Sequence, residues 1–147
     1  VSLIATPVSS QASVARAPEL YRYDNHYTKA EKRTCSFERN NHYSRSETFD
    51  TYHCVYRKIN PDDMGIAGYI ALRESGFNAY AKNSTSTASG VYQFIAGTWA
   101  SHWRTFRYYG VTRARHLVND VFDARSNIFI AAYVMRRWGG TDWRMMC

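Results

Sequence analysis

Glu74 is the residue with the clearest capacity for acid–base chemistry, because it lies at the end of an apolar helix face. Ala67, Ile70 and Ala71 recur at helical spacing, and Glu74 continues the same face. Burial disfavours the charged form of a carboxyl group and raises its pKa, which suits a general acid near neutral pH. The alternative is a glutamate in the last turn that swings out to solvent. Helix geometry alone leaves both open.

The helix expected to carry this carboxyl group begins near residue 61 and ends at Gly76. Asp62 and Asp63 can cap its free N–H groups, and their charge suits the positive end of a helix. Gly76 readily adopts the left-handed conformation that closes a helix. Residues 77–89, rich in Ser, Thr, Asn and Ala, then form a surface loop.

Three motifs in fixed order resemble the signature of the lytic transglycosylase domain of the lysozyme-like superfamily. They are Glu74-Ser75-Gly76, Gly90-Val91-Tyr92-Gln93, and Asn127-Ile128 at the start of a helix preceded by Asp123. The resemblance covers about residues 62–143 and implies a mainly α, lysozyme-like α+β domain with Glu74 as its catalytic acid. Residues 94–99 are similar to the version found in phage tail and cell-wall-remodelling proteins.

The resemblance also implies a set of substrate-binding residues around Glu74. They are Ser75, Tyr92, Gln93, Asn127 and Tyr133. The amide of Gln93 has a donor and an acceptor for a sugar acetamido or hydroxyl group, or it bonds the loop backbone instead. Tyr92 replaces an apolar residue common at this position and could stack on a sugar ring. The loop 77–89 is expected to line the glycan groove.

Tyr133 departs from the pattern of the resembled family. That family has a Tyr seven residues after the Asn, and this chain has Val134 there, with the tyrosine one residue earlier. A shift of one residue turns a helical side chain by about 100°. Either the helix register is adjusted, or Tyr133 lies outside the site.

The number of carboxylates bears on the mechanism. No Asp or Glu lies between Glu74 and Asp120, and Asp123 is better placed to cap the final helix. Glycoside hydrolases normally use two carboxylates, whereas the resembled transglycosylases use one. We therefore expect non-hydrolytic cleavage of the MurNAc–GlcNAc β-1,4 bond of bacterial peptidoglycan, giving 1,6-anhydro-MurNAc ends. The alternatives are a hydrolytic muramidase of the same fold and a non-catalytic wall-binding or virion structural module.

Two further helices are expected to pack the core of the domain. The first has apolar and aromatic residues at helical spacing: Ile95, Trp99, His102, Trp103 and Phe106. The second runs from Asp123 to Gly139-Gly140 with this buried stripe: Ile128, Ala131, Ala132, Met135 and Trp138. Between them, a basic and aromatic surface either holds carboxylates of the glycan or is solvated. Its residues are Arg104, Arg107, Tyr108, Tyr109, Arg113 and Arg115.

The composition favours a soluble domain with a polyanionic partner. The 147 residues carry a net charge of +7, with 45% hydrophobic and 16% aromatic residues. Such a charge suits nucleic acid, an anionic membrane or a bacterial wall. No basic run of the nucleic-acid type and no run long enough to span a membrane occurs, so we expect no nucleic-acid partner and no membrane span. We expect no metal or cofactor, glycan strands as the substrate, and phage tail or virion proteins as possible partners.

The N-terminal third lies outside the resemblance. Residues 1–17 are small and apolar, either a signal remnant with Ser10-Gln11-Ala12 as its cleavage site or a disordered leader. Residues 18–60 are expected to form an irregular accessory segment with some helix that packs against the catalytic domain at 61–147. Residues 49–56 alternate loosely and could form a short strand.

The cysteines of the chain bear on its compartment. Cys35 and Cys54 could form a disulfide, or either could pair with Cys147, and a disulfide indicates an oxidising compartment. A zinc site formed by Cys35, His42, His53 and Cys54 matches no usual spacing. An extracellular, periplasmic or virion-associated location follows from the resemblance.

Overall fold

The computed structural model describes residues 43–138, and this part of the chain is mainly helical. Its elements are α3 (Arg45–Ile59), the 3₁₀ turn η2 (Pro61–Asp63), α4 (Met64–Ser75), α5 (Ala96–Tyr108), α6 (Val111–Ala114) and α7 (Ala124–Trp138). Pairing of β type within these residues is limited to two isolated bridges, Lys82–Ser89 and Ser89–Phe94. The expected mainly α fold is confirmed. The expected leader, Cys35, Cys147 and the stop at Gly139-Gly140 lie outside the described residues.

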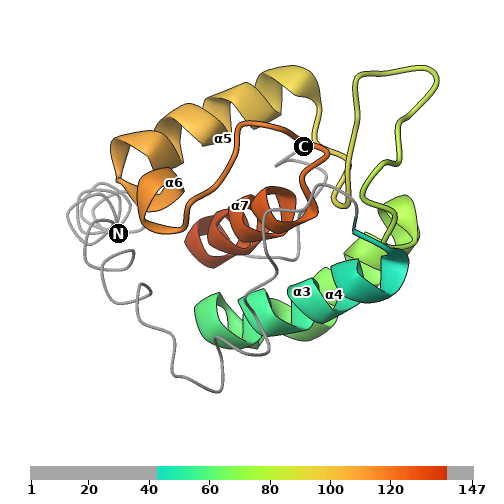
Figure 1. Ribbon diagram of the computed structural model, residues 1–147, viewed down its shortest axis with the longest axis horizontal. Coiled ribbons are helices and arrows are strands. Elements are labelled where there is room, and N and C mark those ends of the chain that lie inside the picture. Colours follow the sequence, from blue (N-terminus) through green and yellow to red (C-terminus); the bar gives the residue numbers. More distant parts are fainter. Residues whose placement is uncertain (1–42, 139–147) are drawn as a thin grey trace, which may run out of the picture.

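The central element is α7, which lies between α5 on one side and the pair α3 and α4 on the other (Figure 1). Every residue from Ser126 to Met135 is buried, so this helix is enclosed on all sides. A helix that is apolar all round is expected to occupy a core. The predicted stripe is therefore confirmed and widened, except at Trp138, whose side chain is exposed.

The start of α7 follows the sequence prediction. The Asp123 carboxylate accepts a hydrogen bond from the backbone N–H of Ser126 at 2.9 Å, which is the geometry of an N-cap. The N–H of Asn127 donates to the carbonyl of Asp123 at 2.9 Å and begins the helical ladder. Asp123 therefore fixes where α7 begins and which way Asn127 faces.

Residues 45–59 form a helix, so the strand expected at 49–56 is wrong. A capping box sets the start of α3, because Ser44 and Glu47 each accept a hydrogen bond from the other's backbone N–H at 3.1 Å. The buried side chains recur at helical spacing: Thr48, Thr51, Tyr52, Val55, Tyr56 and Ile59. They pack mainly against α7, so this part of the expected accessory segment contributes to the same hydrophobic core.

The crossing of α3 and α4 depends on a glycine. The Tyr52 ring lies over Gly68, where an added Cβ would be 2.4 Å from the Tyr52 hydroxyl oxygen. The Tyr52 hydroxyl donates to the carbonyl of Met64 in the first turn of α4. The two helices can approach this closely only because position 68 has no side chain.

The chain enters α4 differently from the sequence prediction. Neither Asp62 nor Asp63 caps this helix with its side chain. Asn60 instead caps the preceding 3₁₀ turn, because its amide oxygen accepts a hydrogen bond from the Asp63 N–H at 3.3 Å. Its amide nitrogen donates to the Asp63 carboxylate at 2.8 Å. The predicted buried stripe of α4, at Ala67, Ile70 and Ala71, is confirmed.

The remaining long helix, α5, rests on α7 through part of its predicted apolar face. Trp99 and Phe106 are buried and Trp103 is half-buried, but Ile95 is exposed, contrary to the prediction. A free N–H group at the N-terminus of α5 finds its hydrogen-bond acceptor in the loop, because the Thr87 hydroxyl oxygen accepts from the Ala96 N–H at 3.0 Å. The loop 77–89 is thereby attached to the start of α5.

The helix crossing gives a matched test of packing. We expect Gly68→Ala to destabilise the protein by about 1–3 kcal/mol, because the new methyl group overlaps the Tyr52 ring. Gly65→Ala in the same helix has nothing within 4 Å of the new Cβ, and we expect it to stabilise by up to about 1 kcal/mol through helix propensity. Guanidinium unfolding measures both, and equal free energies of unfolding would contradict the crossing.

The core tyrosines predict a loss of stability in alkali. Burial is the main cause that raises the pKa of both Tyr56 and Tyr92 well above the usual value near 10. The folded state therefore favours the neutral phenols, so their contribution is complete below pH 10 and falls as the pH rises above it. The expected slope is about 1.4 kcal/mol per pH unit for each tyrosine.

Unfolding by guanidinium between pH 8 and 11 measures this slope. Tyr56→Phe should reduce the slope, whereas Tyr108→Phe should not, because the Tyr108 side chain is 84% exposed. Equal slopes for the wild type and Tyr56→Phe would contradict the assignment.

Candidate active site

The end of α4, where Glu74 lies, closes in two consecutive left-handed residues. Gly76 has φ of 60° and Phe77 has φ of 59°. The N–H groups of these residues donate to the carbonyls of Leu72 (2.9 Å) and Ala71 (3.5 Å) respectively. A left-handed phenylalanine is strained, and its ring is held by Phe49 at 5.2 Å and Tyr52 at 5.5 Å. The chain direction after Glu74 is therefore fixed by the core.

Ser75 joins this helix end to the Gly90–Gln93 turn. Its hydroxyl lies 2.7 Å from the carbonyl oxygen of Val91 and 3.2 Å from that of Ala71, and donates its one proton mainly to the nearer. The side chain expected to bind substrate is thus engaged with backbone. Its contact brings the first two sequence motifs together and places Glu74 next to the turn.

Asn127 joins the third motif to the same turn. Its amide oxygen accepts from the Tyr92 N–H at 3.1 Å, and its amide nitrogen donates to the Val121 carbonyl at 2.8 Å. Gly90, with φ of 80°, lies between these groups, and a Cβ there would be 2.3 Å from the Val121 oxygen. The Asn127 side chain is fully buried, so it supports the turn and does not face a ligand.

Gln93 ends the turn in the left-handed region, with φ of 54°. Its amide nitrogen donates to the carbonyls of Ala81 (3.0 Å) and Gly90 (2.9 Å), so both of its protons are used. The alternative in which this side chain bonds the loop backbone is therefore what the structure contains. The side chain is half-buried, and only its oxygen remains for a ligand.

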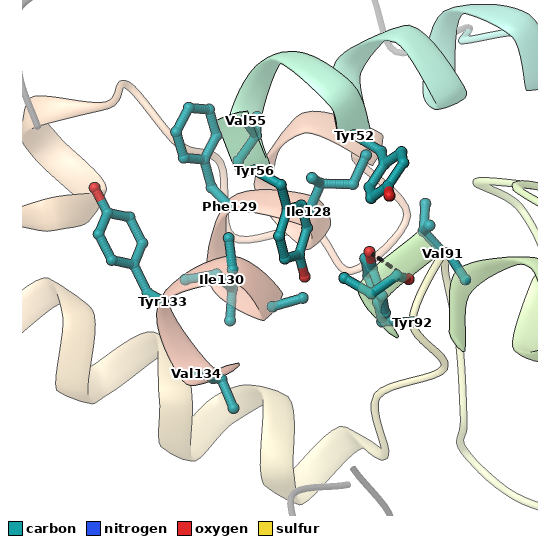
Figure 2. Packing of buried hydrophobic residues seen from close by; sticks show 14 of the residues in the cluster. Tyr52, Val55, Tyr56, Val91, Tyr92, Ile128, Phe129, Ile130, Tyr133 and Val134 are labelled. Atoms are coloured by element: carbon teal, nitrogen blue, oxygen red, sulfur yellow. Dashed lines mark hydrogen bonds between the residues drawn. The ribbon is translucent and has the colours of Figure 1, made fainter. Parts of the chain in front are cut away.

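Tyr92 has no exposed surface, so it cannot stack on a sugar ring in this conformation. Its hydroxyl donates to the carbonyl of Ala67 in α4 at 3.1 Å, and its ring lies 6.2 Å from that of Tyr56 (Figure 2). The sequence interpretation missed Tyr56 because it did not recognise α3 as a core helix. The apolar periodicity of residues 48–59 was the signal that could have found it.

Tyr133 is buried on the side of α7 that packs against Phe106 of α5. Figure 2 shows Tyr133 and Tyr92 pointing away from each other. The Tyr133 hydroxyl accepts from the Arg115 side chain at 3.2 Å, and its ring lies 5.7 Å from that of Phe106. The structure thus does not bring Tyr133 to Glu74, in line with the one-residue departure noted above. Val134 is buried as well.

Glu74 itself is half-buried, with 30% of its side chain exposed. This lies between the two sequence expectations of a buried acid and a solvated residue. One carboxylate oxygen is 3.9 Å from a guanidinium nitrogen of Arg73. A carboxyl group with this exposure is accessible to a substrate.

Other carboxylates of the described residues lie away from Glu74 or are already engaged. Asp62 and Asp63 are at the opposite end of α4, about 16 Å along the helix. Asp123 caps α7. On α3, Glu47 is engaged in the capping box with Ser44. Two exposed carboxylates remain as further candidates: Asp120 precedes Val121, whose carbonyl lies against Gly90, and Asp50 follows Phe49, whose ring packs on Phe77.

Within residues 43–138, no group of three or more His, Cys, Asp or Glu side chains could hold a metal ion. Cys35 and His42 of the zinc alternative lie outside this range. Among the same residues, no helix has the length and apolarity needed to cross a membrane. Cys54 is disulfide-bonded.

Comparison with known families gives one finding. The family model described as "Transglycosylase SLT domain" matches residues 57–141. The match begins in the last turn of α3 and includes all three sequence motifs. No curated protein and no solved structure matches the chain.

The close approach at Gly90 predicts a large effect of one methyl group. We expect Gly90→Ala to lower the free energy of unfolding by about 3 kcal/mol or more, because backbone strain adds to overlap with Val121 and Asn127. Gly110→Ala is the matched control, since Gly110 has a similar φ of 78° with nothing within 4 Å. It should cost only about 1 kcal/mol in strain. Similar losses in thermal or guanidinium unfolding would show that the contact is unimportant.

Proposed function

The chain belongs to the transglycosylase SLT domain family, and we propose that it cleaves peptidoglycan with Glu74 as the sole catalytic carboxyl group. The family supports peptidoglycan lytic transglycosylase activity in general. The finer proposal concerns the bond, the residue and the product. The bond is the β-1,4 linkage between MurNAc and GlcNAc, and the product carries a 1,6-anhydro-MurNAc end.

The observation that carries this proposal is the Ser75–Val91 hydrogen bond of 2.7 Å. It fixes the last turn of α4 against the Gly90–Gln93 turn, so that Glu74 lies beside this turn on a rigid support. Catalytic groups act best when they are held in place before the substrate arrives. The left-handed residues Phe77 and Gln93, on either side of this contact, are consistent with strain stored at a functional site.

The proposed reaction needs one proton-transfer group. The Glu74 carboxyl gives its proton to the glycosidic oxygen as the bond from that oxygen to C1 of MurNAc breaks. The resulting carboxylate then takes the proton of the C6 hydroxyl while O6 bonds to C1. Glu74 ends in its starting state, and no water is consumed. The Gln93 oxygen is free to accept a hydrogen bond from a sugar N–H or O–H group.

The spacing of carboxylates supports the lyase over the hydrolase. Glycoside hydrolases place their two carboxyl groups about 5–10 Å apart, and Asp62 and Asp63 are too far from Glu74 for this. The positions of Asp120 and Asp50 keep the muramidase as a second candidate. Asp120 precedes the residue whose carbonyl lies against Gly90, and Asp50 follows Phe49, which packs on Phe77 beside the end of α4. A non-catalytic wall-binding or virion module remains the third.

The proposal extends to the setting of the enzyme. Peptidoglycan lies outside the cytoplasm, so we place the protein in an extracellular, periplasmic or virion-associated setting. The disulfide at Cys54 supports an oxidising compartment. Phage tail or virion proteins as partners rest only on the similarity of residues 94–99. We assign the catalytic domain to residues 61–147, with α3 packed into its core.

Three isosteric substitutions test the single-carboxylate mechanism. Glu74→Gln should lower the rate of lysis of purified sacculi by about 100-fold or more, because the proton donor is lost. Asp120→Asn and Asp50→Asn should each leave the rate within about twofold. Mass spectrometry of the muropeptides should show 1,6-anhydro ends in the wild-type digest.

The other outcomes separate the alternatives. Reducing ends together with a loss of activity in Asp120→Asn or Asp50→Asn would establish the two-carboxylate hydrolase. Unchanged lysis by Glu74→Gln would remove Glu74 from the mechanism, and absence of lysis by the wild type would favour the non-catalytic module.

A further inference from the structure

The surface formed by α5 and α6 carries charge of one sign only. Residues 75–119 contain no Asp or Glu. Within them, four exposed side chains define what we call the α5–α6 basic face: Arg104, Arg107, Tyr108 and Arg113. The first three lie on one stripe of α5, because positions 104, 107 and 108 are separated by three and four residues. Arg113 follows on α6, which packs beside α5.

The three arginines of this face have no counter-charge in the described part of the chain. Arg104, Arg107 and Arg113 make no ion pair or side-chain hydrogen bond with any residue of the range 43–138. Tyr108 is 84% exposed, which is the largest exposure among the large hydrophobic and aromatic side chains of this range. Its ring meets that of Tyr109 edge-on at 5.2 Å. The Arg137 guanidinium lies 5.8 Å from the centre of this same Tyr109 ring and adds a further positive charge nearby.

The basic face lies at the far end of α5 from the proposed active site. The helix begins just after the Gly90–Gln93 turn and runs for 13 residues, which is about 20 Å. Figure 1 shows α6 at the end of the molecule opposite the loop that follows α4. A ligand on this face would therefore not occupy the site at Glu74, and the two could be filled together.

We propose that the α5–α6 basic face binds a phosphodiester polymer of the bacterial cell wall, such as a poly(glycerol phosphate) or poly(ribitol phosphate) chain. Arginine offers paired N–H donors that match phosphate oxygens, and a row of like charges one helical turn apart suits a polymer with regularly spaced anions. The exposed Tyr108 ring offers an apolar surface for the carbon backbone between phosphates. This inference rests on the proposed function for the location of the partner.

Other polyanions fit the face less well. Single-stranded nucleic acid is bound by successive stacking aromatics, and this face has one fully exposed ring. A membrane-surface helix needs a continuous apolar face beside its cations, and the outer stripe of α5 carries small, polar and charged residues apart from Tyr108. Peptide carboxylates of peptidoglycan are the closest competitor, so the experiment separates them from phosphate.

The experiment measures binding to insoluble sacculi by sedimentation, with the full chain carrying Glu74→Gln so that the substrate is not digested. The test variant is Arg104→Gln/Arg107→Gln. The matched control is Arg57→Gln/Lys58→Gln, which removes two charges from the last turn of α3. Sacculi with their phosphodiester polymer and sacculi stripped of it by hydrofluoric acid are compared, over a range of salt concentrations. A 30-mer single-stranded oligonucleotide is the third ligand.

We expect the test variant to bind the polymer-bearing sacculi about tenfold or more weakly than the control, with a shallower salt dependence. Stripped sacculi should bind both variants equally. A difference that persists on stripped sacculi would assign the face to peptidoglycan carboxylates and overturn the proposal. Tighter binding of the oligonucleotide than of the polymer would also overturn it, as would equal binding of both variants to every ligand. None of these results depends on whether Glu74 is catalytic.

Discussion

The Gly90–Gln93 turn is the constraint on which the proposed site depends, because the end of α4 and the start of α7 both bond to it. Ser75 from the end of α4 donates to the Val91 carbonyl at 2.7 Å, and Asn127 from the start of α7 accepts from the Tyr92 N–H at 3.1 Å. Gly90 makes this possible, since a side chain at this position would collide with Val121 and Asn127. The three motifs of the sequence therefore describe one physical contact. Their function in the fold is to hold the turn against the helix that carries Glu74.

Most of the residues thought to touch substrate instead support the turn. The polar side-chain groups of three of them, Ser75, Asn127 and Tyr92, form hydrogen bonds with backbone groups. Asn127 and Tyr92 are also fully buried. Buried polar groups are stable only when they are hydrogen-bonded, and removing one partner leaves the other unsatisfied. These side chains therefore shape the site by rigidity. The groups left to meet a ligand are the Glu74 carboxyl and the Gln93 amide oxygen.

The central helix α7 explains why the turn can be held so rigidly. Its residues from Ser126 to Met135 are buried, and the helix packs against α3 and α5, so its first turn cannot move without disturbing the core. The Tyr56 ring from α3 contacts both Met135 of α7 and Tyr92 of the turn. The supporting layer behind the site therefore comes from a segment that the three motifs do not include.

Local signals in the sequence determined the elements with strong patterns. The α4 stripe, its stop at Gly76 and the Asp123 cap of α7 follow from helical periodicity and from the conformations that Gly and Asp favour. The ordered motifs also identified the family and the candidate acid. The α3 helix was missed because its aromatic and β-branched residues suggest a strand when local propensity is considered without the Ser44 capping box.

Tertiary structure alone decided what each side chain does. A sequence gives the spacing of Tyr92, Asn127 and Tyr133, but burial depends on which other helices cover them. The donors of Gln93 are used by Ala81, 12 residues earlier, and no local pattern indicates that contact. Tyr133 faces Arg115 and Phe106 because the register of α7 against α5 and α6 turns it there. Periodicity fixes which residues share a helix face, whereas the packing of one helix on another fixes what that face meets.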